Sequence, residues 1–318
     1  MPVRTPVVEQ VQRAQFRNVA VVDIAFASEA GGTSFETTTL PFIDGLGKRL
    51  VAWVDHHDST HHARYAGDPR FLLTTKAEHG ACPEMVTPEV VRAAGPVGTI
   101  VCHLDVDGLY AAAKWLRGGS EPYAGADDDA RAIDTRIGTP GPIADRIDRA
   151  LRAHFRDEAL KHRVVRYLVA GCKPGEHHDV IAQAAADFDS MEAETLRLAA
   201  LYEPRQQAVY LDAQRHAKKP FDKTELLLKG QALQPVAIVR HAGFVTLAAT
   251  LEGPLAQGWM HRLTLGGARD DLDTPVYFAR FLTRRQNLDW VHDVAVGAAQ
   301  HLVFGANLQR ERGSNVDT

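Results

Sequence analysis

Aspartate and histidine residues gather at three places in this sequence, each at the end of a short apolar run. The runs are NVAVV, KRLVAWV and GTIVC. The polar residues that follow them are Asp23; Asp55, His56 and His57; and His103, Asp105 and Asp107. Imidazoles exchange protons near neutral pH, and imidazoles together with carboxylates are common ligands of divalent metal ions. If the three places meet in the fold, they predict a metal-binding or acid–base site.

The apolar runs themselves predict that the three places meet. Each run is continuous rather than alternating, rich in β-branched residues, and about as long as a strand buried in a parallel sheet. In open α/β sheets, ligands bind where the carboxyl ends of the strands converge. The segments DGLYAAAKWLRGG and PEMVTPEVVRAA read as crossover helices. We therefore expect an α/β fold with all three groups at one edge of a parallel sheet.

The rest of the chain predicts two further parts. From about residue 138 the sequence reads as mainly helical up to about His216, and KKPFDKTE reads as a linker. PVAIVRHAGFVTLAATL is typical of a β-hairpin that turns at His241, TPVYFARFLTRR is typical of a strand, and WVHDVAVGAAQHLV fits either a strand or a helix. The expected parts are a catalytic domain in residues 1–155, a helical connector in 156–218 and a smaller α/β domain in 219–318.

Composition limits the classes of protein to which the chain could belong. The 318 residues carry a formal net charge of -4, which disfavours a processive nuclease that needs a basic channel for long DNA. Three widely spaced cysteines argue against a disulfide framework. No signal peptide and no membrane-spanning run is evident, so we expect a soluble cytoplasmic protein with no membrane partner. The sequence leaves open whether the chain forms a homodimer.

Four motifs resemble those of the DHH phosphoesterase superfamily, which includes RecJ-type exonucleases, nano-RNases, cyclic-dinucleotide phosphodiesterases, manganese pyrophosphatases and exopolyphosphatases. VDHH is similar to the motif that names the superfamily, and HLDVDG to its H-x-D-x-D-G motif. VVDIAF resembles the motif with a single bridging aspartate, Asp23, and AIDTRIG the D-T motif, with Asp134. The resemblance covers about residues 15–145. The motif order differs from the usual one, as if this domain were circularly permuted.

The resemblance implies two divalent cations, with manganese as the expected metal and magnesium or cobalt as alternatives. One ion would take Asp23, His103 and Asp105. The other would take Asp23, His56, Asp107 and Asp134. Asp55 would orient a ligating imidazole, and His57 would contact the phosphate or help to protonate the leaving group. Because of the unusual motif order, Asp127, Asp128 or Asp129 could replace Asp134, although a solvated acidic turn is the simpler interpretation of these three.

The function that the resemblance implies is hydrolysis by a water activated between two metal ions. The expected enzyme is a phosphodiesterase acting on short single-stranded oligonucleotides, cyclic nucleotides or small phosphorylated nucleotides. An inorganic pyrophosphatase or exopolyphosphatase is the first alternative, and a non-catalytic nucleotide sensor is the second. The second half of the chain would bind substrate, and its candidate residues are Arg240, His241, Arg280 and His301.

Four other histidines have simpler interpretations. His61 and His62 follow the DHH motif, and we expect them to be solvated loop residues. His177 and His178 imitate that motif, but they follow a Pro-Gly turn rather than an apolar run. We expect these two histidines to lie at a solvated helix start and to take no part in the site.

Overall fold

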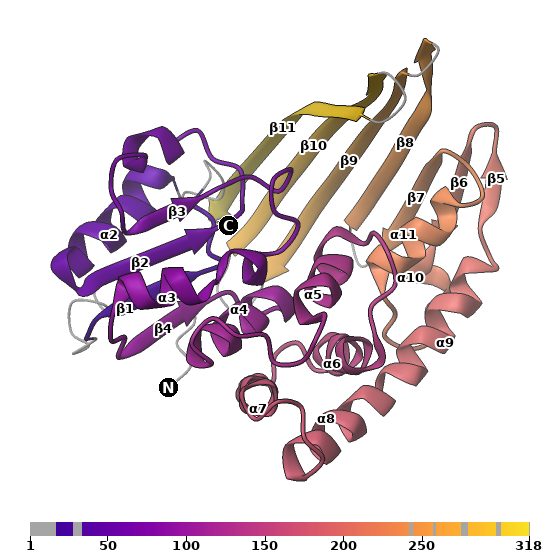
Figure 1. Ribbon diagram of the computed structural model, residues 1–318. Coiled ribbons are helices and arrows are strands. Elements are labelled where there is room, and N and C mark those ends of the chain that lie inside the picture. Colours follow the sequence, from indigo (N-terminus) through magenta and orange to yellow (C-terminus); the bar gives the residue numbers. More distant parts are fainter. Residues whose placement is uncertain are drawn as a thin grey trace. The chain divides into compact units, whose positions relative to one another are not determined.

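The computed structural model describes residues 17–27, 34–241, 244–256, 259–274, 279–296 and 300–317. These residues form two compact units, one of the described residues up to Asp189 and one of those from Ser190 onward. Figure 1 gives the labels of the helices and strands.

The first unit contains a parallel four-stranded sheet with the order β3-β2-β1-β4. The strands are β1 (Val19–Val22), β2 (Leu50–Asp55), β3 (Phe71–Leu73) and β4 (Thr99–Cys102). The parallel sheet and the three strands expected from the apolar runs are therefore confirmed. Strand β3 could not be predicted, because its three residues are too few to form a recognisable apolar run.

Both faces of this sheet are covered, which explains why the runs are continuous. Val19, Val21 and Trp53 pack on one face against the π-helical turn η1 (Phe35–Thr39) and helix α2 (Leu40–Leu46). The alternate residues of β1 and β2 pack on the other face. Their partners there are the 3-10 turn η4 (Cys82–Met85), α3 (Pro88–Ala94) and α4 (Val106–Leu116).

The remaining helices of the first unit pack on the far side of α4. A single core joins α4 to α5, α6, α7 and α8 through residues such as Tyr110, Ile147 and Leu168. The helices are α5 (Ala126–Thr135), α6 (Pro142–Ala153), α7 (Glu158–Val169), α8 (Glu176–Ala186) and α9 (Phe188–Ala199), the last of which runs into the second unit. Two further 3-10 turns are η2 (Gly47–Arg49) and η3 (His62–Tyr65).

The second unit contains a mixed seven-stranded sheet with the order β11-β10-β9-β8-β7-β6-β5. Strands β6 and β7 are parallel, and the other neighbours are antiparallel. The strands are β5 (Glu203–Arg205), β6 (Ala208–Asp212), β7 (Val236–His241), β8 (Phe244–Ala256), β9 (Trp259–Thr274), β10 (Ala279–Val296) and β11 (Gln300–Asp317). The helices are α10 (Ala213–His216) and α11 (Lys223–Gln231).

Two local predictions for this unit are wrong, and one is confirmed. Strands β5 and β6 lie where the sequence predicted helix; Val209 and Leu211 are buried at alternate positions of β6, a period-2 pattern too short to stand out. The predicted linker KKPFDKTE contains the first turn of α11, which begins at Lys223. The hairpin is confirmed, because β7 and β8 pair antiparallel with His241 opposite Phe244.

The helices of the described residues were compared with the length and apolar character of membrane-spanning helices. None of them combines the length and the apolar character that crossing a membrane requires.

Candidate metal centre

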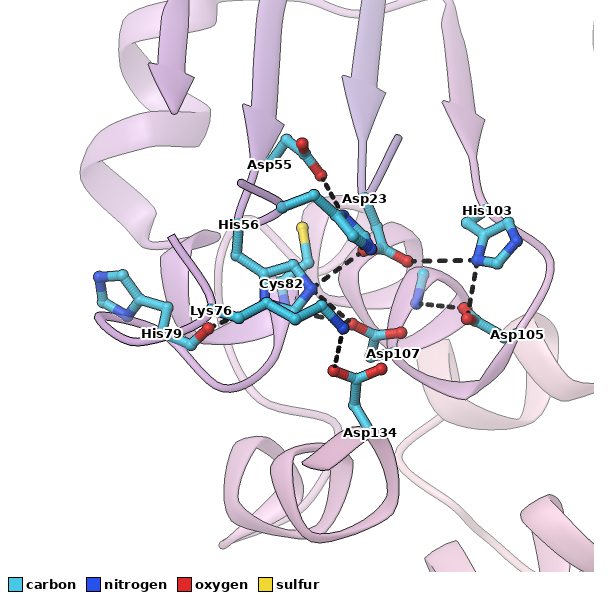
Figure 2. Close-up of polar contacts among 12 residues, drawn as sticks. Asp23, Asp55, His56, Lys76, His79, Cys82, His103, Asp105, Asp107 and Asp134 are labelled. Carbon is cyan, nitrogen blue, oxygen red and sulfur yellow. Dashed lines mark hydrogen bonds and ion pairs between the residues drawn. The ribbon is translucent and has the colours of Figure 1, made fainter. Parts of the chain in front are cut away.

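The predicted residues converge at the carboxyl edge of the first sheet. Asp23 directly follows β1, His56 follows β2 and His103 follows β4, and these three strands run parallel. Strand β1 lies between β2 and β4, so Asp23 occupies the middle position (Figure 2). The convergence expected from the apolar runs is confirmed.

Asp23 stands between the other candidate ligands. Its Oδ1 lies 3.4 Å from Nε2 of His56, and its Oδ2 lies 3.8 Å from Nδ1 of His103. Three sets of donor atoms lie within 4.8 Å of one another, which is close enough to hold a metal ion. The sets are Asp23 with His103 and Asp105, Asp23 with His56 and His57, and His56 with Asp107 and Asp134. Asp23 therefore belongs to two of the three sets.

Helix α4 brings two carboxylates to the site at its N-terminus. Asp105 is the N-cap and accepts a hydrogen bond from the backbone N–H of Gly108 at 3.2 Å. Its Oδ2 lies 2.7 Å from Nδ1 of His103. Asp107 lies in the first turn, with Oδ2 3.3 Å from Nε2 of His56. The positive end of the helix dipole stabilises both carboxylates at this position.

Glycine is required at position 108 by close contacts rather than by an unusual backbone conformation. A Cβ atom there would lie 2.4 Å from the carbonyl oxygen of His103 and 2.9 Å from Oδ2 of Asp23. Neither atom can move without disturbing the site, so α4 can approach β1 and β4 this closely only with glycine at Gly108.

Several polar atoms at the centre have no hydrogen-bond partner among the described residues. They are both carboxylate oxygens of Asp23 and Nε2 of His56, in side chains that are 1% and 0% exposed. His56 donates from Nδ1 to the backbone carbonyl of His79 at 2.8 Å, which directs the lone pair of Nε2 toward the carboxylates. Buried polar atoms are normally paired or coordinate a metal, so these atoms and their N/O donor chemistry fit a divalent cation.

The pKa values of the site residues show how protons offset the buried negative charge. Burial raises the pKa of Asp23 to about 8, and the carboxylates of Asp107 and Asp105 add to this effect. Burial alone would lower the pKa of His56, but the carboxylates of Asp107 and Asp23 beside its Nε2 outweigh burial and raise the pKa to about 10. The hydrogen bond to Asp105 raises the pKa of His103 to about 9. Protons therefore compensate the buried carboxylates when no cation does.

Asp55 has a different partner from the expected one. Its Oδ1 lies 2.8 Å from Nδ1 of His57, whereas the backbone carbonyl of His79 orients His56. The prediction that Asp55 orients a ligating imidazole therefore fails for His56. Asp55 is fully buried and His57 is 30% exposed, so a buried carboxylate fixes an accessible imidazole with Nε2 left for a proton or a substrate.

Asp134 lies near the end of α5 and reaches the set formed with His56 and Asp107. Its Oδ2 also accepts from Nζ of Lys76 at 2.7 Å. None of Asp127, Asp128 and Asp129 belongs to a candidate set among the described residues. The expectation of a solvated acidic turn holds for Asp128, which is 75% exposed, but not for Asp127, which pairs with buried Lys114, or Asp129, which accepts from Tyr123.

Three residues of the site were missed by sequence reasoning. Lys76, His79 and Cys82 lie in the segment that follows β3; Cys82 donates its backbone N–H to Oδ2 of Asp107 at 3.3 Å. Polar residues after an apolar run could have indicated these three residues, but the run FLL, which forms β3, is too short to be recognised as a strand in the sequence. His79 and Cys82 contact the site through backbone atoms, and any residue type could make these contacts, so the sequence does not reveal them.

The four other histidines are placed as follows. His61 stacks on Phe35 with ring centroids 4.1 Å apart, and His62 packs edge-on against Phe26, so both are half-buried rather than fully solvated. Neither belongs to a candidate metal set among the described residues. His177 and His178 lie in the first turn of α8, as predicted for a helix start.

The predicted substrate-binding residues all belong to the second unit. Arg240 pairs with Asp212 at 3.3 Å. His241 lines a pocket of about 710 Å³ together with Lys218, Lys219 and Lys223. Arg280 and His301 lie on β10 and β11, and their side chains are outside the part of the chain that the structure describes.

Replacement of Gly108 tests whether the site needs the close approach of α4. Gly108→Ala should lower the free energy of unfolding by about 1–3 kcal/mol, because the added methyl group collides with backbone and with Asp23. It should also weaken manganese binding. Gly45→Ala in α2 is the matched control, because its added methyl group would meet nothing within 4 Å and the change should be neutral or stabilising by up to about 1 kcal/mol. Equal effects of the two changes in urea unfolding and metal titration would contradict this account.

The raised pKa values predict how metal binding depends on pH. From about pH 6.5 to about pH 8, the folded metal-free protein holds protons on Asp23 and His56 that the unfolded chain releases, so its stability should fall as pH rises. A bound cation must displace the same protons, so its apparent affinity should increase with pH. Thermal unfolding with and without Mn²⁺ should therefore show a larger metal-induced rise in Tm at about pH 8 than at about pH 6.5. An equal rise at both pH values would argue against these two groups as ligands.

Comparison with known proteins assigns no family to the chain. No family model matches the sequence, and no curated protein matches it. The resemblance to DHH phosphoesterases therefore rests on the four sequence motifs.

Proposed function

We propose that the chain is a divalent-metal-dependent phosphodiesterase that hydrolyses small nucleotides. One observation carries this proposal: Asp23 is buried, lacks hydrogen bonds to either carboxylate oxygen among the described residues, and belongs to two candidate metal sets. A carboxylate shared between two sets is the arrangement expected of a bridging ligand in a two-metal site.

The donor sets indicate which residues would hold each cation. Asp23, His103 and Asp105, which form one of the three sets, would hold one ion. As the resemblance implies, Asp23 would join the set of His56, Asp107 and Asp134 to hold the other, since its Oδ1 lies 3.4 Å from Nε2 of His56. Bound divalent cations supply neutralisation of phosphate charge and activation of a water molecule for attack. Manganese suits the mixed imidazole and carboxylate ligands, and magnesium and cobalt are alternatives.

Residues of the chain itself would handle the substrate and the proton. Asp55 holds the Nδ1–H of His57, so Nε2 of His57 can exchange a proton with the leaving oxygen or donate to a phosphate oxygen. Lys76 is 41% exposed beside Asp134, and its ammonium group would attract an anionic substrate to this side of the site. The side chains thus supply proton transfer and orientation.

A small substrate is supported by the charge of the protein. The net charge of -4 gives no sequence-wide electrostatic attraction for a long nucleic acid. The presence of all six expected ligands argues against a catalytically idle sensor, because an idle site has no need to keep buried, mutually repelling carboxylates.

Substitutions at the site should separate metal binding from chemistry. Asp23→Ala should abolish hydrolysis and reduce bound manganese, because one substitution removes a ligand from both sets. Asp107→Ala should affect mainly one ion and be comparably severe in rate. His57→Ala should retain both ions and lose about 10²–10⁴-fold in kcat, the range typical of a general acid or base. His177→Ala is the control, because His177 lies in the segment that imitates the DHH motif, and it should change neither the bound manganese nor kcat.

The measurements are metal stoichiometry and manganese-dependent turnover on a dinucleotide, a cyclic dinucleotide, a nucleoside bisphosphate, inorganic pyrophosphate and single-stranded DNA. Circular dichroism of each variant checks that the fold is retained. Full activity of Asp23→Ala, or loss of activity in His177→Ala with metals retained, would contradict the proposal. Turnover of pyrophosphate alone would replace the phosphodiesterase with the pyrophosphatase alternative.

A further inference from the structure

A cavity of about 250 Å³ adjoins the candidate metal centre within the first unit. It lies where the N-terminus of α4 and the C-terminus of α5 meet the end of α6 and the start of α7. Asp105, Asp107 and Asp134 are among its lining residues, so the cavity and the metal sets share three carboxylates.

The lining of the cavity also includes three cationic side chains. Arg136, Arg152 and Lys161 line it. Asp148 lies 3.0 Å from Arg152 and 3.9 Å from Arg136, so one carboxylate partly neutralises both guanidinium groups. Lys161 has no ion pair with any side chain that the structure describes. When cations neutralise the shared carboxylates, the remaining charge of the lining is positive and suits an anion.

The rest of the lining is apolar. It consists of Leu104, Val106, Ile133, Leu151 and Phe155. Phe155 follows the end of α6 and is 63% exposed, so its ring is accessible to a ligand. The guanidinium of Arg156 lies over its ring, 5.1 Å from the centroid, so this ring already takes part in one stacking contact.

We infer that this cavity binds one nucleotide unit of the substrate, with its phosphate near Lys161 and Arg136 and its base against Phe155. The inference rests on the proposed function and narrows its substrate class. An inorganic polyphosphate has no apolar group to contact the apolar lining, whereas a base gains binding free energy by stacking on an aromatic ring. The volume is below the range of about 300–1,000 Å³ typical of pockets for larger ligands, so it limits the occupant to a single nucleotide unit.

The test measures binding of adenosine monophosphate and of ribose 5-phosphate to the full chain saturated with Mn²⁺. The two ligands share the sugar and phosphate and differ in the base. Lys161→Met should weaken both about tenfold or more, because it removes a charged donor to the phosphate. Phe155→Ala should weaken adenosine monophosphate about tenfold or more and leave ribose 5-phosphate unchanged.

Two control variants match these changes. Lys48→Met removes an exposed lysine next to the start of β2, at the opposite end of the strand from the site, and Leu116→Ala removes an exposed apolar side chain at the end of α4. Neither should alter binding of either ligand. Manganese stoichiometry should be unchanged in all four variants, because none of the four residues belongs to a metal set.

The outcomes distinguish this inference from the proposed function. If Phe155→Ala weakens both ligands equally or neither, the base does not contact this ring and the inference is overturned. If both variants bind normally while the protein still hydrolyses dinucleotides, the proposed function survives without this pocket. If the chain hydrolyses no phosphodiester but shows the expected differences in binding, the pocket stands and the proposed function fails.

Discussion

The structure of the first unit depends on one constraint, the burial of the Asp23 carboxylate at the end of the central strand. The side chain is 1% exposed, and its backbone has a φ of 55°, in the left-handed region that costs free energy for a residue other than glycine. A buried carboxylate without hydrogen bonds costs several kcal/mol unless charge compensates it. Protons on Asp23 itself and on His56 and His103 provide that compensation, and divalent cations can provide it in their place.

The strand order turns three distant sequence segments into one site. Because β1 lies between β2 and β4, a residue after β1 reaches groups on both neighbours, while residues after β2 and β4 reach only the centre. Helix α4 then closes the site from one side, with Asp105 and Asp107 at its positive end and Gly108 allowing close contact. This geometry depends on adjacency and direction of the strands rather than on their order along the chain. A permuted motif order is therefore compatible with the same cluster.

The part of the site that could be predicted from sequence is the part carried by side chains at the ends of recognisable strands. Asp23, His56, His103, Asp105 and Asp107 follow this rule. The partner of Asp55 could have been deduced as well, because side chains alternate along an extended chain and residues 55 and 57 point to the same side. The backbone contacts of His79 and Cys82 could not, since any residue type can make them. Strands β3 and β6 are too short for their period to exceed chance.

The cationic residues of the adjoining cavity could not be predicted as a binding site, and the reason is physical. Arg136, Arg152 and Lys161 come from the end of α5, from α6 and from α7, and each looks like an ordinary charge on a helix surface in the sequence. The net charge that they give to the cavity depends on Asp148, which neutralises part of their charge, and on the lining carboxylates that cations can neutralise. An acidic metal site repels an anionic substrate when it is empty and attracts it when it is loaded. The cavity would therefore accept a nucleotide only after the metal ions are in place, which couples substrate affinity to metal occupancy.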